Sequence, residues 1–357
     1  MKICYISSKS IHTRRWVKYF AEKGHEVHLI TNKPDDIDNV HVYVIDLNLW
    51  KLSPIFKALI IRRLVKRIKP DILHVHQAIP FGPYGVLSGF HPWVLSIWGS
   101  ISIYPEKSIL HKFLVQHILK KADLVQCGDE SLAERVKSLI GERSSIHIIK
   151  WGIDPDLFKP KKIEKKDERF RILYLRRSQE PYSVEILLYA IPEVIKKHEN
   201  VEFLILKSGR ELNKTFNIVK ELGIEKYVRF IDEVPNDKLP KLMNSCDIYV
   251  DTFYRETPGS GIGMAALEAM SCGLPVVLSN TAGVDIHIKH KVNGYIYKGH
   301  DSNSLANAII ELIKDRNQRE KLGENARKYI INNQNWKENM KLMENFYEKL
   351  TKLKGGY

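Results

Sequence analysis

Residues 257–280 read TPGSGIGMAALEAMSCGLPVVLSN and follow an apolar, strand-like run that ends near Phe253. Gly259, Gly261 and Gly263 stand close together at the start of this stretch, and glycine lets a backbone come close to a ligand. Helical sequence starts close to Gly261, and the N–H groups of a first helical turn, together with the helix dipole, favour negatively charged oxygens. The stretch therefore predicts a strand, a glycine-rich loop and a helix that can hold an anion, although a tight turn without a ligand would carry the same glycines.

Glu268 lies two turns into the predicted helix, in the sequence LEAM. Its neighbours Leu267, Ala269 and Met270 are apolar and should be buried, so the carboxylate stands in an apolar setting. An ionised carboxylate only accepts hydrogen bonds, and it can accept two of them from the neighbouring hydroxyls of a ribose. A solvated helix residue is the alternative, but the apolar setting favours a contact with a ligand.

Outside this stretch, short apolar runs alternate with helical sequence in two successive series. The first series opens with KICYISS, continues through a helical segment that ends at Gly24, and resumes with EVHLIT. Repeated alternation of this kind implies a parallel sheet with helices on both faces. The strand-like runs are residues 2–8, 26–31, 40–46, 71–77, 93–99 and 124–128 in the first series and 169–175, 201–206, 227–231, 247–253 and 275–279 in the second.

Length and one charged segment divide the chain. Its 357 residues exceed the roughly 250–300 at which a single core stops growing. Residues 159–169, KPKKIEKKDER, carry nine charges and no aromatic side chain, which is typical of a solvated linker. We therefore predict one domain at 1–158, a second at 169–333, and a last helix at 334–357 that packs back across the domain junction. The predicted fold class is α/β, with two Rossmann-like, doubly wound domains that face a central cleft, where such folds bind ligands.

The chain is basic and its cysteines are isolated. Lys and Arg number 56 against 42 Asp and Glu, and the formal net charge of +14 favours anionic partners without choosing among nucleic acid, anionic lipid and phosphate-bearing substrates. No helix-turn-helix, RNP-like or zinc-finger signature indicates a specific nucleic acid. The cysteines form no C-x-x-C pair and no zinc spacing, which favours buried thiols in a reduced, cytoplasmic protein.

Residues 78–105 contain no Asp, Glu, Lys or Arg, and a membrane-spanning helix would need a stretch of about this length. Four prolines and four glycines interrupt it. We therefore expect a buried strand–turn–strand passage here and no bilayer helix.

Residues 54–70, PIFKALIIRRLVKRIKP, predict a basic amphipathic helix. In a doubly wound domain such a helix packs on the sheet. Its basic face can also rest on anionic lipid, where each surface Lys or Arg adds about 1 kcal/mol, and both roles can hold together. The expected apolar side comprises Ile55, Leu59, Ile60, Leu64, Val65 and Ile68, and the basic residues mostly elsewhere are Lys57, Arg62, Arg63, Lys66, Arg67 and Lys69.

The order of the motifs resembles the retaining GT-B glycosyltransferases of family four. LEAMSCGLPVVLSNTAG followed by VNGYIYKG, within residues 267–299, looks like the donor-binding half of that family. KWGIDPDLFKP (150–160) resembles its domain-joining segment, ILYLRRSQ (172–179) its Gly-Arg strand end, and residues 228–253 the stretch from the base-binding turn to the phosphate loop. GHEVHLIT and PDILHVH resemble strands of its amino-terminal domain, so the resemblance spans nearly the whole chain.

The resemblance implies transfer of a sugar from a nucleotide-sugar donor to a lipid-linked, polysaccharide or other glycan acceptor, with retention of configuration. It implies that Glu268 binds the ribose and that Arg177 neutralises the donor diphosphate, while Arg176 shares that role or caps the strand. Arginine suits phosphate because its rigid fork of donors keeps its charge. Fixed donors and a helix start can stabilise the leaving diphosphate without metal, so we expect no obligatory divalent cation and no other cofactor. The expected donor-binding residues are Arg176, Arg177, Gly261, Ile262, Gly263, Met264 and Glu268.

Four departures from the family pattern fall at the expected site. The first Glu of the family's E-x7-E pattern is replaced by Ser260, and a usual Lys aligns with Tyr182. Trp98 stands where a His often ends the fourth strand of the amino-terminal domain, and SSKSIHTRRW replaces a Gly-Gly pair after the first strand. Ser260 is a candidate for binding a sugar hydroxyl, and His12 with Ser8 for the acceptor-side loop; loss of activity is the alternative. The candidate catalytic residues are Arg177, Ser260 and His12, and the acceptor side comprises Ser8, His12, Trp98 and Gly99.

Other functions suit a two-domain α/β chain. A nicotinamide-dependent oxidoreductase would need G-x-G-x-x-G after its first strand, and SSKSIHTRRW lacks it. A nucleotide-sugar epimerase on the same fold and a non-catalytic nucleotide-sugar-binding protein are the alternatives that stay open. The expected location is the cytoplasm, with peripheral association at the inner face of the cell membrane.

Overall fold

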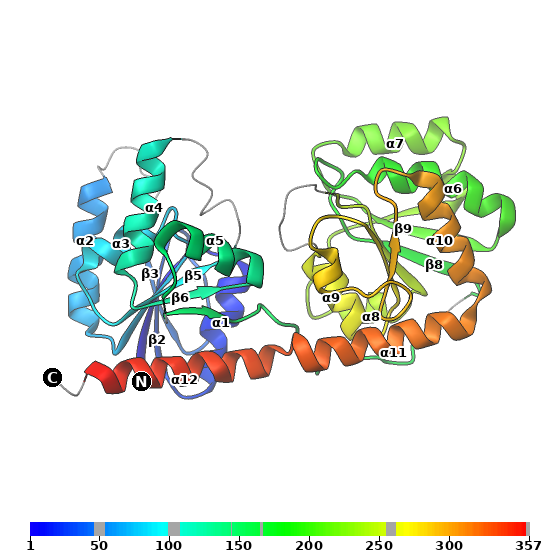
Figure 1. Ribbon diagram of the computed structural model, residues 1–357. Helices are drawn as coiled ribbons and strands as arrows, with labels where there is room; N and C mark the ends of the chain where they lie inside the picture. The colour runs from blue at the N-terminus through cyan, green and yellow to red at the C-terminus, as the bar shows by residue number, and fades with distance from the viewer. Residues whose placement is uncertain (46–53, 99–107, 144, 165–166, 255–261, 355–357) are drawn as a thin grey trace. The chain divides into compact units, whose positions relative to one another are not determined.

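The computed structural model describes residues 1–45, 54–98, 108–143, 145–164, 167–254 and 262–354. The chain forms two compact units, Met1–Trp151 with Glu338–Tyr357 and Gly152–Lys337. Each unit contains a parallel sheet flanked by helices (Figure 1), and we call the two units the amino-terminal and the carboxyl-terminal domain. The predicted α/β architecture of two Rossmann-like domains is therefore confirmed.

The sheet of the amino-terminal domain has the strand order β3-β2-β1-β4-β5-β6-β7, with every pair parallel. All five residues of β4, ILHVH, are buried because helices cover both faces of a central parallel strand. The order reverses between β1 and β4, and open α/β sheets bind ligands beyond the carboxyl ends of the strands at such a reversal. The strands are β1 (Lys2–Ile6), β2 (Glu26–Thr31), β3 (Val40–Val44), β4 (Ile72–His76), β5 (Trp93–Ile97), β6 (Leu124–Cys127) and β7 (Ile146–Ile148), and the helices are α1 (Ile11–Glu22), α2 (Pro54–Ile68), α3 (Gly82–Ser88), α4 (Ile109–Lys121) and α5 (Glu130–Ile140).

The sheet of the carboxyl-terminal domain is also parallel, in the order β10-β9-β8-β11-β12-β13, and its reversal lies between β8 and β11. The four cysteines of the chain are buried, as predicted. The strands are β8 (Phe170–Tyr174), β9 (Val201–Leu206), β10 (Val228–Ile231), β11 (Ile248–Asp251), β12 (Val276–Ser279) and β13 (Tyr295–Tyr297). The helices are α6 (Val184–Lys197), α7 (Leu212–Glu221), α8 (Leu239–Met243), α9 (Met264–Ser271), α10 (Ser302–Lys314) and α11 (Arg316–Asn333).

The last helix, α12 (Trp336–Lys354), starts in the carboxyl-terminal domain and continues in the amino-terminal one. Tyr347 of α12 is fully buried, and its hydroxyl contacts His74 Nδ1 and the hydroxyl of Tyr5. Glu344 Oε1 lies 2.8 Å from Nε2 of His25. The helix from Glu338 onward is thus part of the core of the amino-terminal domain.

For residues 78–105 the expected buried strand is present as β5, but the expected turn before it is wrong, because α3 occupies Gly82–Ser88. Pro83 suits the first turn of a helix, where no backbone N–H is needed, and Gly89 ends the helix in the left-handed conformation at φ 64°. No helix among the described residues is long and apolar enough to cross a membrane.

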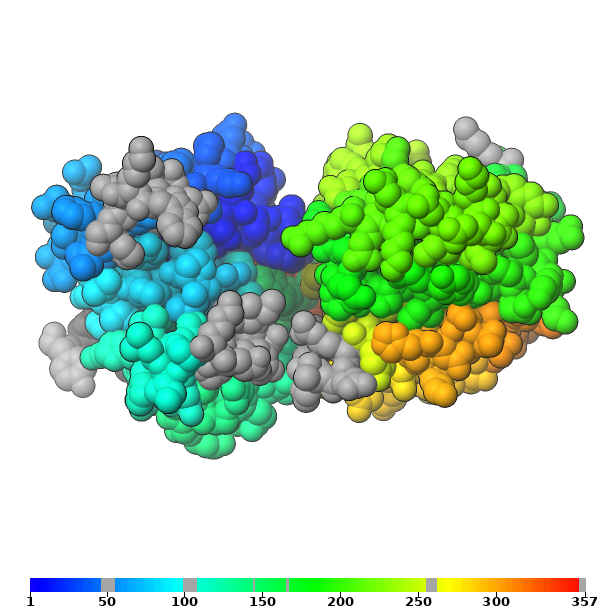
Figure 2. Space-filling model, turned by 90° about the horizontal axis from the view of Figure 1, so that it is seen from above, coloured from blue at the N-terminus to red at the C-terminus, as the bar shows by residue number. Residues whose placement is uncertain are grey.

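The predicted apolar side of α2 is correct at Val65 and Ile68, which are buried, and wrong at the start of the helix. Lys57 is only 6% exposed, whereas Ile55, Leu59 and Ile60 are exposed. The reason is that apolar residues occur around most of this helix, while the sheet covers only one stripe of it. Figure 2 shows light-blue atoms of α2 at the surface of the amino-terminal domain. The stripe that faces the core consists of Lys57, Ala58, Ile61, Val65 and Ile68.

Candidate active site

The loop after β8 brings two adjacent arginines to the carboxyl end of the second sheet. Arg176 reaches Asp251, the last residue of the neighbouring strand β11, and places Nε and a terminal nitrogen 2.8 and 2.7 Å from Asp251 Oδ2. The Asp251 side chain is 5% exposed, and its Oδ1 accepts a hydrogen bond from the backbone N–H of Phe253 at 2.9 Å. The ion pair therefore ties β8 to β11 at the reversal of the strand order.

The guanidinium of Arg176 also lies against the start of α9. A Cβ added to Gly263, the residue before this helix, would stand 2.1 Å from an Arg176 nitrogen, so a larger residue would displace the guanidinium. The ring centroids of Tyr182 and Phe253 lie 5.0 and 5.5 Å from the guanidinium carbon, within cation–π range. Burial disfavours the charged form, but the neighbouring Asp251 outweighs burial and raises the pKa of Arg176 above its ordinary value. The arginine therefore stays charged beside the helix start.

The backbone of the arginine loop is held by the loop between β9 and α7. Ser178 N–H donates to the Ser208 carbonyl at 2.7 Å, and the Ser178 carbonyl accepts from Glu211 N–H at 2.8 Å. Gly209 has φ +125°, and a Cβ there would meet the Ser178 backbone at 2.4 Å. Both facts require glycine at this position, which fixes the path of the loop.

Arg177 pairs with a carboxylate of the loop after β10. Its side chain is 58% exposed, and a terminal nitrogen donates to Glu233 Oε1 at 3.1 Å. The same oxygen accepts from Ser208 Oγ at 3.0 Å. The arginine predicted to neutralise the diphosphate thus stands in solvent with a carboxylate partner, and the neighbouring Arg176 holds the position against the helix.

Glu268 is buried in the second turn of α9. Its exposed fraction is 7%, and Oε1 accepts a hydrogen bond from Asn236 Nδ2 at 3.4 Å. Asn236 belongs to the loop after β10, so this loop meets the helix that follows β11. Gly263 is the N-cap residue of α9, and within the described ranges no side chain caps this helix. The neighbours Leu267, Ala269 and Met270 are buried, as predicted.

A small pocket lies beside Arg176 at the carboxyl ends of β11 and β12. It brings together Arg176 and Ile262 of the predicted donor residues, but neither Arg177 nor Glu268 lines it. Met264 begins α9 and packs on the core of the domain. Ser260 and Gly261, also predicted for the site, lie outside the described residues. The lining residues are Arg176, Asp251, Phe253, Ile262, Leu278, Ser279 and Thr281.

In the amino-terminal domain, hydroxyl groups order the loop between β1 and α1. Thr13 Oγ1 donates to the Ser8 carbonyl at 2.8 Å and lies 2.8 Å from Ser7 Oγ. Ser10 caps α1, because its Oγ accepts from Thr13 N–H at 3.1 Å. Ser8, predicted for the acceptor side, therefore contributes its backbone carbonyl to this network.

His12, Trp98 and Trp151 form an aromatic cluster near the carboxyl ends of β1 and β5. The Trp151 ring centroid lies 4.5 Å from that of His12 and 4.4 Å from that of Trp98. Burial, with a smaller effect of the charge on Arg15, lowers the pKa of His12 to about 4, so the imidazole is neutral at physiological pH. The structure brings His12 and Trp98 together, and Gly99, the remaining acceptor-side residue, lies outside the described residues.

His76 lies beneath this cluster at the end of β4 and is fully buried. Its ring centroid is 4.0 Å from that of Trp98, and its Nδ1 is 3.0 Å from Ser7 Oγ. Burial, and then the neighbouring His74 and His12, hold the pKa of His76 well below its ordinary value. The cluster is therefore built on an uncharged imidazole.

Sequence reasoning missed Asp251, His76 and Trp151. The first two share a signal that could have found them, since each is a polar residue at the end of a buried parallel strand. Trp151 has no comparable signal, because its ring contacts come from α1 and from the residue after β5.

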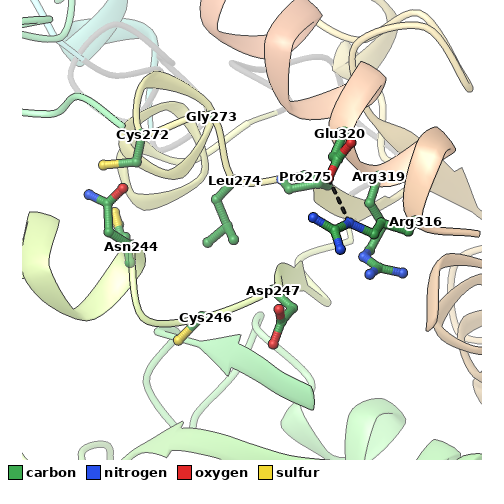
Figure 3. A pocket seen from close by; sticks show the side chains of 11 residues that line it. Asn244, Cys246, Asp247, Cys272, Gly273, Leu274, Pro275, Arg316, Arg319 and Glu320 are labelled. Carbon is green, nitrogen blue, oxygen red and sulfur yellow. Dashed lines mark hydrogen bonds and ion pairs between the residues drawn. The ribbon is translucent and has the colours of Figure 1, made fainter. Parts of the chain in front are cut away.

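A larger pocket lies at the opposite ends of β11 and β12 (Figure 3). Asn244 and Asp247 precede β11 there, Pro275 precedes β12, and α11 supplies Arg316 and Glu320, which pair at 2.8 Å. Parallel sheets bind ligands beyond their carboxyl ends, so this pocket is separate from the candidate active site.

Two family profiles match the chain. The profile described as Glycosyl transferases group 1 covers residues 156–329, and the profile described as Glycosyl transferase 4-like covers residues 2–128. Each match falls within one of the two domains.

Curated relatives are similar over much of the chain. D-inositol 3-phosphate glycosyltransferase of Corynebacterium jeikeium is 27% identical over 254 residues, which are 66% of this chain and 59% of the relative. N-acetyl-alpha-D-glucosaminyl L-malate synthase of Bacillus anthracis is 23% identical over 342 residues, which are 88% of this chain and 86% of the relative. The match thus spans less than two thirds of the first relative and most of the second.

Solved structures share the fold. A glycosyltransferase from Rickettsia africae ESF-5 superposes with a TM-score of 0.83 at 16% identity and covers 98% of both chains. HepE of Anabaena, solved with UDP-glucose, superposes with a TM-score of 0.78 at 18% identity and covers 98% of this chain and all of that one. At these identities the likeness establishes the architecture of the chain.

Proposed function

This chain belongs to the GT-B glycosyltransferases of family four, and we propose on that premise that it transfers a sugar from a nucleotide-sugar donor to an acceptor. One observation carries the proposal. Arg176, charged and held against the start of α9, stands with the buried Glu268 of the same helix at the carboxyl ends of the strands. Such an arrangement suits a ligand that has both a diphosphate and a ribose.

In the proposed complex, Glu268 accepts hydrogen bonds from the ribose hydroxyls, and the N–H groups at the start of α9 donate to the diphosphate. Arg176 supplies positive charge beside those N–H groups. The departing diphosphate gains negative charge as the sugar–oxygen bond breaks, and donors that are already oriented stabilise this charge without rearranging. Removing either side chain should therefore weaken donor binding.

We propose that Arg177 leaves Glu233 and pairs with the diphosphate when the donor binds. Both side chains of this ion pair are more than half exposed, and such a pair is worth less than about 1 kcal/mol. The exchange therefore costs little, and a diphosphate with two charges is a stronger partner than one carboxylate.

The acceptor is proposed to bind on the amino-terminal domain, at the loop of Ser8 and His12 and at Trp98 and Gly99. His12 is neutral at physiological pH and so can accept a hydrogen bond from an acceptor hydroxyl. We propose that the departing phosphate oxygen removes the acceptor proton on the same face of the sugar, which retains the anomeric configuration, and that Ser260 binds a sugar hydroxyl. Lipid-linked or other glycan acceptors are the proposed class.

We propose that no divalent metal is obligatory, since two arginines and a helix start can supply the positive charge. Dialysis against EDTA should leave donor affinity unchanged. A loss of affinity that Mg²⁺ or Mn²⁺ restores would contradict this.

We also propose that the basic residues of 54–70 rest on anionic lipid, which would place the enzyme peripherally at the inner face of the cell membrane. Arg62, Arg63, Lys66 and Arg67 are all exposed and are available for such a contact.

The first test is thermal stabilisation by UDP-, GDP-, ADP- and dTDP-sugars. A ligand at 100 times its dissociation constant stabilises the folded state by about 2.7 kcal/mol, which gives a clear rise in melting temperature. Glu268→Ala should abolish the rise, and Glu320→Ala, at the opposite ends of the strands, should keep it. No rise with any donor would contradict the proposal.

Product analysis then separates the alternatives on this fold. A glycosyltransferase gives a glycosylated acceptor, an epimerase gives an isomerised nucleotide sugar, and a protein that only binds the donor gives neither product.

A further inference from the structure

Large apolar side chains are exposed at the starts of α2 and α4. Each has between 42% and 79% of its surface exposed, with Leu110 the most exposed. Single exposed apolar residues are normal in soluble proteins, but a concentration of them indicates an interaction site. We call these residues the apolar surface: Ile55, Phe56, Leu59 and Ile60 of α2, and Ile109, Leu110, Phe113 and Leu114 of α4.

The topology brings both helix starts to one edge of the domain. In a parallel sheet, a helix that follows a strand begins beside the carboxyl end of that strand; α2 follows β3 and α4 follows β5. α3 packs against both helices (Figure 1), and a Cβ on Gly82 of α3 would stand 2.6 Å from Ile118 of α4. The apolar surface therefore lies at the same edge as the cluster of His12 and Trp98.

The core of the domain does not need these side chains. α4 buries Val115, Ile118 and Leu119, which lie later in the helix. α2 buries a stripe from Lys57 to Ile68 that excludes its four exposed apolar residues. Each helix thus has a second apolar face outside the core, and these two faces form the exposed apolar surface.

The Lys and Arg side chains of α2 and α4 give these two helices charges of one sign. Neither α2 nor α4 contains Asp or Glu. At 1.5 Å per residue, Arg63 to Arg67 lie about 6 to 12 Å along the helix from Leu59, a span similar to a layer of lipid headgroups. On α4, Lys112, Lys120 and Lys121 are exposed. Apolar side chains followed by cations match the acyl boundary and the anionic headgroups of a bilayer.

We propose that the apolar surface inserts shallowly into an anionic membrane while the basic residues further along α2 and α4 contact the headgroups. This deepens the proposed lipid contact of residues 54–70, because insertion orients the domain with the carboxyl ends of β1 and β4 toward the bilayer. The inference rests on the proposed function only in assigning a lipid-linked acceptor, which would reach the site from that side.

A fluorescent probe tests insertion directly. The four cysteines are buried, so Leu110→Cys can be labelled selectively with an environment-sensitive nitrobenzoxadiazole group. Tyr189→Cys, on an exposed residue of α6 in the other domain, is the matched control. Vesicles of phosphatidylcholine with phosphatidylserine should raise the emission and shift it to the blue at position 110 only. Equal responses at both positions, or none at 110, would overturn the proposal.

Substitutions give a second test by vesicle flotation. Leu110→Glu with Phe113→Glu should weaken binding by about tenfold or more, because apolar burial is lost and carboxylates are added. Tyr189→Glu with Val292→Glu, also exposed apolar residues, should bind like the unmodified protein. Unchanged flotation of the first variant would refute insertion.

A second copy of the chain is the competing occupant of the apolar surface. Sedimentation of the unmodified protein without lipid should show no dimer that depends on the apolar surface. A dimer that disappears in Leu110→Glu would overturn the membrane assignment. The donor-induced rise in melting temperature should persist in Leu110→Glu with Phe113→Glu. Loss of vesicle binding and failure of the proposed transferase function are therefore distinguishable.

Discussion

Replacing Arg176 with methionine should destabilise the carboxyl-terminal domain far more than the same change at Arg177. Methionine keeps part of the stem but removes the guanidinium, and the 5% exposed Asp251 side chain then keeps its hydrogen bond from Phe253 without its ionic partner. Breaking a buried ion pair costs about 3–5 kcal/mol, and the 17% exposure of the Arg176 side chain places the expected loss near the lower end. The exposed pair of Arg177 and Glu233 should cost less than about 1 kcal/mol.

A double-mutant cycle gives the coupling within the buried pair. Arg176→Met, Asp251→Asn and the double variant should show a coupling of about 2 kcal/mol, because each single change removes the same interaction. Denaturant unfolding of a two-domain chain need not be two-state. Hydrogen exchange of the backbone amides in β8 and β11, read by mass spectrometry, reports the opening free energy of this domain by itself.

The outcome distinguishes the two arginines. Similar losses of stability at Arg176 and Arg177, or a coupling near zero, would refute the assignment of Arg176 as the buried partner of Asp251. Donor affinity should fall in both variants, since both arginines are proposed to meet the diphosphate. If Arg177→Met leaves the affinity for the donor unchanged, Arg176 is the arginine that binds the donor.

Three further predictions concern the two sites. Gly263→Ala should reduce donor affinity by about tenfold or more in titration calorimetry, because the added Cβ would stand 2.1 Å from an Arg176 nitrogen and displace the guanidinium; full affinity would show that the contact is not needed. Glu268→Ala should lower donor affinity by about tenfold or more with the circular dichroism spectrum unchanged, as expected for lost ribose hydrogen bonds. Burial lowers the pKa of His74 to about 3 and that of His76 well below its ordinary value, whereas the unfolded chain takes up these protons below about pH 6.5. Stability should be full above that pH and fall on acidification by up to about 1.4 kcal/mol per pH unit for each histidine, and His76→Asn should flatten the melting temperature profile; an unchanged profile would contradict this.

Local patterns predicted most of the elements. The strand before the glycine-rich loop ends at Asp251 and the helix after it begins at Met264, a few residues beyond the predicted start near Gly261. The burial of Leu267, Ala269 and Met270 followed from their apolar character alone. These features depend on neighbours within a few residues, which a sequence displays directly.

Contacts between distant segments could not be predicted in this way. RRS at residues 176–178 presents two arginines in succession, and which of them meets Asp251 depends on the register of β8 beside β11, two strands far apart in the chain. The same holds for α2, where apolar residues occur all around the helix and only its position on the sheet selects the buried stripe.

The sequence by itself determined the alternation of strands and helices, the division into two α/β domains and the family motifs, because backbone geometry gives strands and helices their own periods of apolar residues. Only the tertiary structure decided that Arg176 rather than Arg177 lies against the start of α9, that His76 and Trp151 join His12 and Trp98, and that α2 and α4 expose apolar side chains at one edge. Each of these depends on which segments become neighbours when parallel strands pair out of chain order, and the local sequence does not encode that choice.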